Sequence, residues 1–433
     1  MKKGTHPVRL LAYVAAGCLL YTTSMTQVRA DAQAPTLKMN GYTIVNAASA
    51  KQQRSDNGKG GSEPYIGIGA SDLYFTVTGK AANGMEYKYR INFETIPGSS
   101  AYVNKNYVEV NGNFGTLQAG AVTGPDDTMP ESGANLIGGA NGIDGTMNCM
   151  YNYSAGAIKG VNFVGETKKA TKAVFYSPEV MGFQLGFAFT PNTSHMGDAN
   201  RNNAILGDGQ GIGTPSGIYA NKAISPYGTR NMTLGLTYKG SVDKWSYAFA
   251  AVGVTEKSHY VDPSQFGQRQ ITLKNARSYQ LSASVGYDKW KVAAGWIDNG
   301  KSRLPKDSTL YYSDSTNTKL LLGNTHLGNA GKAWNVGTSY TVGAYQFATA
   351  YHRTDRRTDA TGNASSDIIA TSVDLSALQG LKVFGEVDFI KTRTNANAVA
   401  IQRSYMDNVE KKGNQAISNN SGAVFVVGTK VSF

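Results

Sequence analysis

The chain has 433 residues, with 50 glycines, 25 tyrosines and only 12 prolines, and 17% of its residues are charged. This composition excludes an ordinary helix-rich globular protein and is typical of a β-protein with many turns and aromatic belts. The formal net charge is +12, but the basic residues are scattered along the chain, which gives no indication of nucleic-acid binding.

Residues 1–30 are predicted to be a secretory signal peptide. The basic residues Lys2, Lys3 and Arg9 precede an apolar run over residues 10–20, and a small-x-small site ends at Ala30. We expect cleavage before Asp31. Removing the four basic residues of the signal leaves 38 basic against 30 acidic residues, a net charge of +8.

The two cysteines give little further constraint. Cys18 follows Ala16-Gly17, as at a lipoprotein site, but Ala15 stands where a larger aliphatic residue is expected, so lipidation is the less favoured alternative. After removal of the signal only Cys149 remains, which excludes an intrachain disulfide. No later segment has about 18 continuous apolar residues, but a secreted chain can also cross a membrane as a closed barrel.

Alternation with a period of two recurs from residue 37 to the end. In Met85–Thr95 the residues Tyr87, Tyr89, Ile91 and Phe93 fall on one face, and the other face carries charged and polar residues. In a soluble sandwich the apolar face would form the core. In a transmembrane barrel it would meet lipid, and the charged face would meet the lumen.

The set of strands favours the barrel. The stretches Arg277–Asp288, Trp290–Trp296, Trp334–Val342 and Tyr345–Tyr351 each place an aromatic residue near both ends of the apolar face, with small aliphatic residues between. Amphipathic aromatic rings at the two ends of a strand suit the two membrane interfaces.

Connection lengths predict the number of strands. Seven short turns alternate with eight long connections, so the chain has sixteen predicted strands. The short turns lie near Ala81–Gly84, Asn111–Asn113, Pro178–Gly182, Gly240–Asp243, Asp288–Lys289, Val342–Ala344 and Ala377–Gly380. The long connections lie near Ala50–Pro64, Ile96–Tyr102, Thr123–Ala170, Pro191–Thr229, Lys257–Ala276, Gly300–Gly331, Thr354–Ala364 and Thr394–Asn420. We therefore predict an all-β fold, a 16-stranded antiparallel transmembrane β-barrel wide enough for an aqueous channel.

The last predicted strand, Ala423–Phe433, ends on an aromatic residue. Pairing with the first strand, near Leu37–Ser49, would close the barrel and remove both free edges. Phe433 is either an ordinary end of an amphipathic strand or an assembly signal, and its terminal position favours the signal.

The stretch from Gly124 to Gly145, within the long connection 123–170, contains no strand pattern. Asp127 and Glu131 are four residues apart, a spacing that would place both carboxylates on one face of a helical turn, with Pro130 in a first turn. This stretch is either a solvated surface excursion or a loop that folds into the barrel and presents its acids to the solute path.

Four local motifs now resemble those of the general diffusion porins of the Gram-negative outer membrane. They are Phe114–Gly120 (FGTLQAG), Asp127–Gly133 (DTMPESG), Tyr176–Phe183 (YSPEVMGF) and the terminal Phe433. Each motif alone is weak evidence for this family, but the four motifs in this order and with these spacings are specific to it. The resemblance covers the architecture of residues 31–433.

The resemblance implies a homotrimer of barrels in the outer membrane, each with its own pore for ions and small hydrophilic solutes. It implies contact with outer-membrane lipids and recognition of Phe433 by the barrel assembly machinery. It also implies that the third long connection narrows the pore and that its acids face a basic wall, producing a transverse field. The corresponding acids are Asp126, Asp127 and Glu131, and the candidate wall residues are Lys88, Arg90, Lys105 and Lys172.

Some positions depart from the family pattern. Ala121 and Phe175 stand where the family often has arginines, so the basic ladder is thinner than usual. Glu386 and Asp388 add acids to the predicted lumen face of Leu381–Ile390. Selectivity is not predictable from this balance.

No pattern indicates an enzyme, a cofactor or a metal site. The histidines include no HExxH motif, Cys149 has no CxxC partner, and Gly207–Gly213 follows no βα unit. Three functions remain: a passive diffusion porin, which we favour, a substrate-specific porin with an aromatic ladder in its lumen, and an adhesin or rim enzyme on a plugged barrel.

Overall fold

The computed structural model describes residues 33–53, 64–95, 102–139, 142–144, 150–151, 153, 169–193, 226–260, 273–304, 306, 311–313, 319–321, 329–357, 362–394 and 419–433. The predicted signal peptide (1–30), Cys149, the glycine-rich stretch 207–213 and much of the connection 123–170 lie outside these residues.

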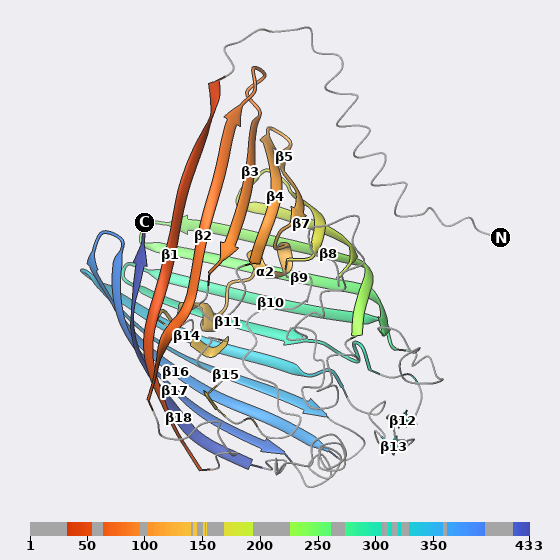
Figure 1. Ribbon diagram of the computed structural model, residues 1–433, viewed down its shortest axis with the longest axis vertical. Coiled ribbons are helices and arrows are strands. Elements are labelled where there is room, and N and C mark those ends of the chain that lie inside the picture. The colour runs from red at the N-terminus through yellow and green to blue at the C-terminus, as the bar shows by residue number, and fades with distance from the viewer. Residues whose placement is uncertain are drawn as a thin grey trace, which may run out of the picture.

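Sixteen antiparallel strands close into one barrel, which confirms the predicted strand count (Figure 1). They are β1 (Gln33–Gln52), β2 (Tyr65–Lys80), β3 (Glu86–Glu94), β4 (Tyr102–Gly112), β5 (Gly115–Ala121), β6 (Thr171–Tyr176), β7 (Phe183–Asn192), β8 (Pro226–Val242), β9 (Trp245–Tyr260), β10 (Ala276–Tyr287), β11 (Trp290–Asp298), β14 (Lys332–Val342), β15 (Tyr345–Arg357), β16 (Asn363–Leu378), β17 (Leu381–Thr394) and β18 (Asn419–Ser432).

The first and last strands close the barrel. Strand β1 pairs with β18 from Tyr42 opposite Ser432 to Gln52 opposite Gly422. In Figure 1 the red β1 accordingly runs beside the blue β18. Closure leaves neither strand with an unpaired edge, as expected from the terminal strand pattern.

One short hairpin was not predicted. Strands β12 (Tyr311–Ser313) and β13 (Lys319–Leu321) form a separate two-stranded sheet within the connection between β11 and β14. Each strand has three residues, too few for alternation with a period of two to be recognisable in the sequence.

The apolar residues of the wall point outward. On β10 the residues Tyr279 and Leu281 are 56% and 54% exposed, whereas Ser278 and Gln280, which alternate with them, are 0% and 1% exposed. This is the reverse of a soluble sandwich, which would bury its apolar face. It is the arrangement of a barrel whose outer face meets lipid and whose interior is polar.

Within the described ranges, no helix is long and apolar enough to cross a membrane. Among the described residues, the helices are single turns in the connection after β5. They are α2 (Pro125–Thr128), η1 (Gly133–Leu136) and η2 (Gly142–Asp144), and α2 contacts β7, β8 and β9.

Candidate functional site

The connection after β5 lies against the inner face of the barrel, and we call its described part, residues 122–139 with 142–144, the inner segment. Its backbone N–H groups donate to inward-facing side chains of three strands in turn. Glu131 N donates to Ser282 Oγ on β10 at 2.9 Å, and Gly133 N donates to Asn335 Oδ1 on β14 at 2.8 Å. Gly139 N donates to Asp374 Oδ1 on β16 at 2.9 Å. The inner segment is therefore bonded to the inner wall along its length.

Glycines of the wall make room for the inner segment. A Cβ on Gly186 of β7 or on Gly235 of β8 would lie 2.5 Å from Met129 Sδ. A Cβ on Gly337 of β14 would lie 2.5 Å from the carbonyl oxygen of Gly133. Side chains at these inward positions would displace the segment, so glycine is required for the close approach.

The helical turn differs from the one expected. Helix α2 begins with Pro125 and ends at Thr128, so Asp127 and Glu131 do not share a helical face, and that prediction is wrong. The physical reason is Pro130, which has no N–H to continue the helix, so the helix ends with Met129 as its last residue in helical geometry. Pro125 instead takes the first-turn position. Thr128 Oγ1 contacts Tyr176 Oη at 2.6 Å, which ties the turn to β6.

Glu131 is the centre of an ion cluster between the inner segment and the wall. Lys291 Nζ on β11 lies 2.9 Å from Glu131 Oε2, and Lys239 Nζ on β8 lies 3.8 Å from Glu131 Oε1. Ser284 Oγ donates to the same carboxylate at 2.7 Å. Burial raises the pKa of the Glu131 carboxyl, but the hydrogen bonds from Ser284 and Lys291 and the charges of both lysines outweigh it and hold the pKa below its ordinary value.

The other two candidate acids lie near different cations. The negative charges of Asp126 and Asp127 attract the ammonium group of Lys172. The charge of Asp127 also attracts the ammonium group of Lys105. Asp126 and Lys172 are only 1% and 2% exposed, so the segment and the wall cover them. Lys172 Nζ donates to the Val122 carbonyl, and Lys105 Nζ to Thr123 Oγ1 at 3.4 Å. These contacts hold the start of the inner segment.

The two remaining wall candidates have neighbours on adjacent strands. Lys88 Nζ lies 2.9 Å from Glu109 Oε1 of β4. The Arg90 guanidinium lies over the Tyr74 ring of β2, with its central carbon 4.4 Å from the ring centroid. The four wall candidates thus lie on β3, β4 and β6, whereas Glu131 pairs with Lys239 of β8 and Lys291 of β11.

Sequence reasoning missed Lys239 and Lys291. Both lie on the inward face of their strands, because Trp290 and Val292 beside Lys291 and Leu234 and Leu236 on β8 point outward. The inward orientation of both lysines was therefore predictable from alternation with a period of two. Their pairing with Glu131 was not predictable in this way, since Lys291 and Glu131 are 160 residues apart in the chain.

The inner segment also covers acids on β17. Glu386 and Asp388 face inward, as expected, and are 2% and 1% exposed. A Cβ on Gly139 would lie 3.0 Å from Glu386 Oε2. Among the described residues, no group of three or more His, Cys, Asp or Glu side chains is arranged to hold a metal ion.

Phe433 lies at the seam of the barrel. Its backbone exchanges two hydrogen bonds with Gly41 of β1, each 3.0 Å long. Its side chain is 65% exposed on the outer face, and a Cβ on Gly41 would lie 2.9 Å from the Phe433 ring. The terminal aromatic residue is therefore exposed and bonded to the closing strand pair.

These features define the class of protein. A closed sixteen-stranded barrel with an apolar outer face, a polar interior and a segment bonded to its inner wall is an outer-membrane channel. The family model described as "Gram-negative porin" matches residues 19–395. The chain belongs to the Gram-negative porin family and forms a diffusion channel in the outer membrane.

Sequence relatives are distant. An uncharacterised protein of Rickettsia typhi is 21% identical over 338 residues, which cover 68% of this chain and 71% of that protein. One of Rickettsia felis is 19% identical over 405 residues, covering 82% and 86%.

Solved structures show the same fold. The trimer form of OmpT from Vibrio cholerae matches with a TM-score of 0.52 and 12% identity, covering 93% of this chain and 100% of that one. An anion-selective porin from Comamonas acidovorans matches with a TM-score of 0.51 and 14% identity, covering 92% and 100%.

Proposed function

We propose that the inner segment narrows the channel and that the cluster of Glu131, Lys239 and Lys291 sets its ion preference. The observation that carries this proposal is the series of hydrogen bonds from the segment to β10, β14 and β16, which fixes the segment inside the lumen. A chain bonded to the wall at three strands reduces the open cross-section, and its charges act where solutes pass closest.

The candidate residues take different roles in this proposal. Glu131 and Asp127 face the solute path. Lys239 and Lys291, whose side chains are 57% and 42% exposed, provide the opposing positive charge. Arg90 and Lys88 on β3 and Lys105 on β4 contribute further positive charge. The buried pair of Asp126 and Lys172 anchors the segment.

Passive diffusion of ions and small hydrophilic solutes fits the lumen better than a substrate-specific path. A specific path for apolar or sugar substrates needs aromatic side chains in sequence along the lumen. The Arg90 guanidinium covers the Tyr74 ring. Phe384 is only 4% exposed, because Gly139 of the inner segment lies against its ring. These aromatic side chains do not form a track.

We further propose that the mature chain begins at Asp31, assembles as a homotrimer and is recognised through Phe433 by the barrel assembly machinery. The trimer form of the structurally similar OmpT supports the assembly. The exposed Phe433 ring at the β1–β18 seam supports the recognition, because it remains accessible when the barrel closes.

The double substitution Asp127→Ala with Glu131→Ala tests the charge assignment. Removing two negative charges from the narrowed region is expected to shift the permeability ratio towards anions, measured as the reversal potential of the channel under a salt gradient. The matched control is Glu179→Ala with Asp243→Ala, at two exposed positions in short turns. Unchanged ratios in the first variant would place both acids outside the narrowed region.

A further inference from the structure

Two tyrosines on neighbouring strands share one carboxylate. Tyr42 Oη of β1 donates to Asp72 Oδ2 of β2 at 2.7 Å, and Tyr74 Oη of β2 donates to the same oxygen at 3.1 Å. The two ring centroids lie 6.5 Å apart, and the ring planes are tilted by 31°. Hydrogen bonds to an ionised acceptor are among the stronger ones, so the shared carboxylate fixes the two rings side by side.

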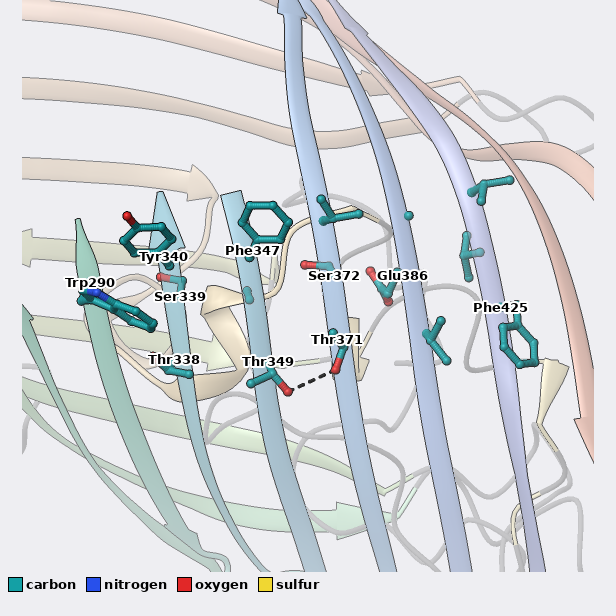
Figure 2. Close-up of a pocket in the computed structure, with 16 residues that line it drawn as sticks. Trp290, Thr338, Ser339, Tyr340, Phe347, Thr349, Thr371, Ser372, Glu386 and Phe425 are labelled. Carbon is teal, nitrogen blue, oxygen red and sulfur yellow. Dashed lines mark hydrogen bonds between the residues drawn. The ribbon is translucent and has the colours of Figure 1, made fainter. Parts of the chain in front are cut away.

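Both rings face the lumen and not the membrane. Aromatic side chains of the outer face lie differently, and Figure 2 shows Trp290 and Phe347 among those that line a groove there. Tyr42 instead packs against the buried cluster that includes Ile137 of the inner segment. Asp72 stands opposite Tyr42 in the β1–β2 ladder, so Tyr74, two residues further along β2, faces the lumen as well.

A basic side chain lies on the face of each ring. Arg90 Cζ of β3 lies 4.4 Å from the Tyr74 centroid, and Lys430 Nζ of β18 lies 4.4 Å from the Tyr42 centroid. The negative face of an aromatic ring attracts a cation at this distance. The two cations, the two rings and Asp72 therefore form a row across the adjacent strands β18, β1, β2 and β3, which we call the tyrosine row.

The ring of Tyr74 is the contact that keeps the Arg90 guanidinium against the wall. Among the described residues, the buried Nε atom of Arg90 has no hydrogen-bond acceptor. Arg90 and Lys430 are both half-buried, so each ends at the boundary between wall and lumen water. Long basic side chains of this kind extend their charged ends into water when no contact with the wall retains them.

The tyrosine row lies beside the start of the inner segment. Lys105 of β4 connects the two, because its Nζ donates to Thr123 Oγ1 of the segment at 3.4 Å. The charges of Asp72 and Asp127 attract the Lys105 ammonium group, and Arg90 lies near enough to repel it. An Arg90 side chain that left the Tyr74 ring would therefore extend into the lumen next to the segment.

We propose that Tyr42 and Tyr74 are positioning residues of the channel, which hold Lys430 and Arg90 against the wall and so keep the path open to larger neutral solutes. This inference rests on the proposal that the inner segment narrows the lumen. At a half-exposed site, contact with an aromatic ring favours a cation by roughly a factor of 5 over water. A basic side chain without that contact spends more time in the path, where it obstructs a large solute more than a small one.

Swelling of liposomes that contain the purified mature protein tests the proposal, with arabinose as the small neutral solute and raffinose as the large one. In Tyr74→Leu the ratio of the raffinose rate to the arabinose rate is expected to fall about twofold, because a fivefold preference keeps Arg90 on the ring for about five-sixths of the time and its loss leaves about half. Tyr74→Phe keeps the ring and is expected to fall less. The matched control is Tyr87→Leu, which removes a tyrosine from the outer face of β3 and is expected to leave the ratio unchanged.

The variant Arg90→Gln separates positioning from structural support of the wall. In the Arg90→Gln background, Tyr74→Leu is expected to have no further effect on the ratio, because the side chain that it would release is gone. Tyr42→Leu in the wild-type and Lys430→Gln backgrounds repeats the comparison at the other end of the tyrosine row, and it decides the matter if Tyr74→Leu does not fold. Heat-modifiable mobility in gel electrophoresis shows that each variant is folded.

Three results would overturn the proposal. An equal fall in the wild-type and Arg90→Gln backgrounds would mean that the Tyr74 ring supports the wall and does not act through Arg90. An unchanged ratio in Tyr74→Leu, with a reversal potential that shifts towards cations in Arg90→Gln, would exclude the positioning role alone and leave the narrowed channel in place. If Arg90→Gln changes neither the reversal potential nor the ratio, the solute path does not pass this wall, and the contribution of Arg90 to the proposed function fails as well.

Discussion

Gly133 of the inner segment packs backbone against backbone on Gly337 of β14, and a Cβ on Gly337 would lie 2.5 Å from the Gly133 carbonyl oxygen. Asn335, two residues earlier on β14, accepts the hydrogen bond from Gly133 N at 2.8 Å. The fit leaves no room for any side chain at either glycine. The position of the segment in the lumen therefore depends on residues of the wall as well as on its own sequence.

Gly337→Ala is expected to push residues 132–134 away from the wall and to break the bond to Asn335. Overpacking of this kind destabilises by about 1–3 kcal/mol. The expected result in single-channel recordings is a noisier current with additional conductance levels. Gly385→Ala is the matched control, because a Cβ there meets its nearest neighbour at an ordinary 3.7 Å. Equal behaviour of the two variants would contradict the close contact.

Lys291→Gln is expected to shift the channel towards cations. Among the described residues, the substitution removes the cation nearest to Glu131 and leaves Lys239, at 3.8 Å. The reversal potential under a salt gradient measures the shift. Lys289→Gln, at an exposed turn two residues earlier, removes the same charge away from the cluster. If both variants shift the potential equally, the effect comes from net charge and not from the Glu131 cluster.

The strand pattern of this barrel was predictable from the sequence, and the contacts of its lumen were not. Alternation between outward aromatic residues and inward polar residues is local, so Tyr279 and Ser278 reveal their faces within a few positions. The partner of Glu131 is set by how the segment crosses the closed barrel, 160 residues away in the chain at Lys291. The predicted shared helical face of Asp127 and Glu131 is wrong because Pro130, which lies between them, has no N–H to continue the helix past Met129.

The contribution of Glu131 to the selectivity of the wild type is expected to be lost only in strongly acidic solution. The pKa of Glu131 is lower in the folded protein than the ordinary Glu value of about 4.3. Its ion pairs therefore stabilise the folded arrangement fully above that value, and this stabilisation is lost as the pH falls through the lowered pKa. The difference in reversal potential between the wild type and Glu131→Gln, recorded from pH 7 downwards, is expected to stay constant until the pH is below about 4.3.

Glu131→Gln provides the control for this titration. The acid-dependent shift is expected to be smaller in the variant, because the group that takes up the proton is gone. A wild-type transition between pH 5 and 7 that disappears in Glu131→Gln would mean that the carboxyl titrates above its ordinary range, contrary to the structure.

Arg303→Met is expected to destabilise the turn after β11. Arg303 Nε lies 2.6 Å from Glu256 Oε1 of β9, with the two side chains 4% and 0% exposed. Removing one partner of such a pair leaves a buried charge and costs about 3–5 kcal/mol. Urea unfolding of the barrel in lipid vesicles measures the loss. Glu256→Gln with Arg303→Met is expected to recover part of it, and Lys301→Met in the same turn to have no effect. Equal loss in the single and double variants would exclude the buried charge as the cause.

Phe433→Ala is expected to reduce the amount of folded barrel in the outer membrane. The exposed ring at the β1–β18 seam is lost, while the backbone bonds to Gly41 remain. The fraction of heat-modifiable protein in isolated outer membranes measures the effect. Phe425→Ala removes an aromatic ring from the same outer face of β18 and is the matched control. Equal yields of the two variants would show that the terminal aromatic residue is not recognised.

The most direct test of a narrowed channel is single-channel conductance of the purified mature protein in a planar bilayer, with a salt gradient to give the reversal potential. We predict stepwise openings, grouped in threes if the trimer forms, with a conductance below that of an unobstructed sixteen-stranded barrel. A well-folded, heat-modifiable barrel that never conducts would contradict this result, since the inner segment would then close the lumen rather than narrow it.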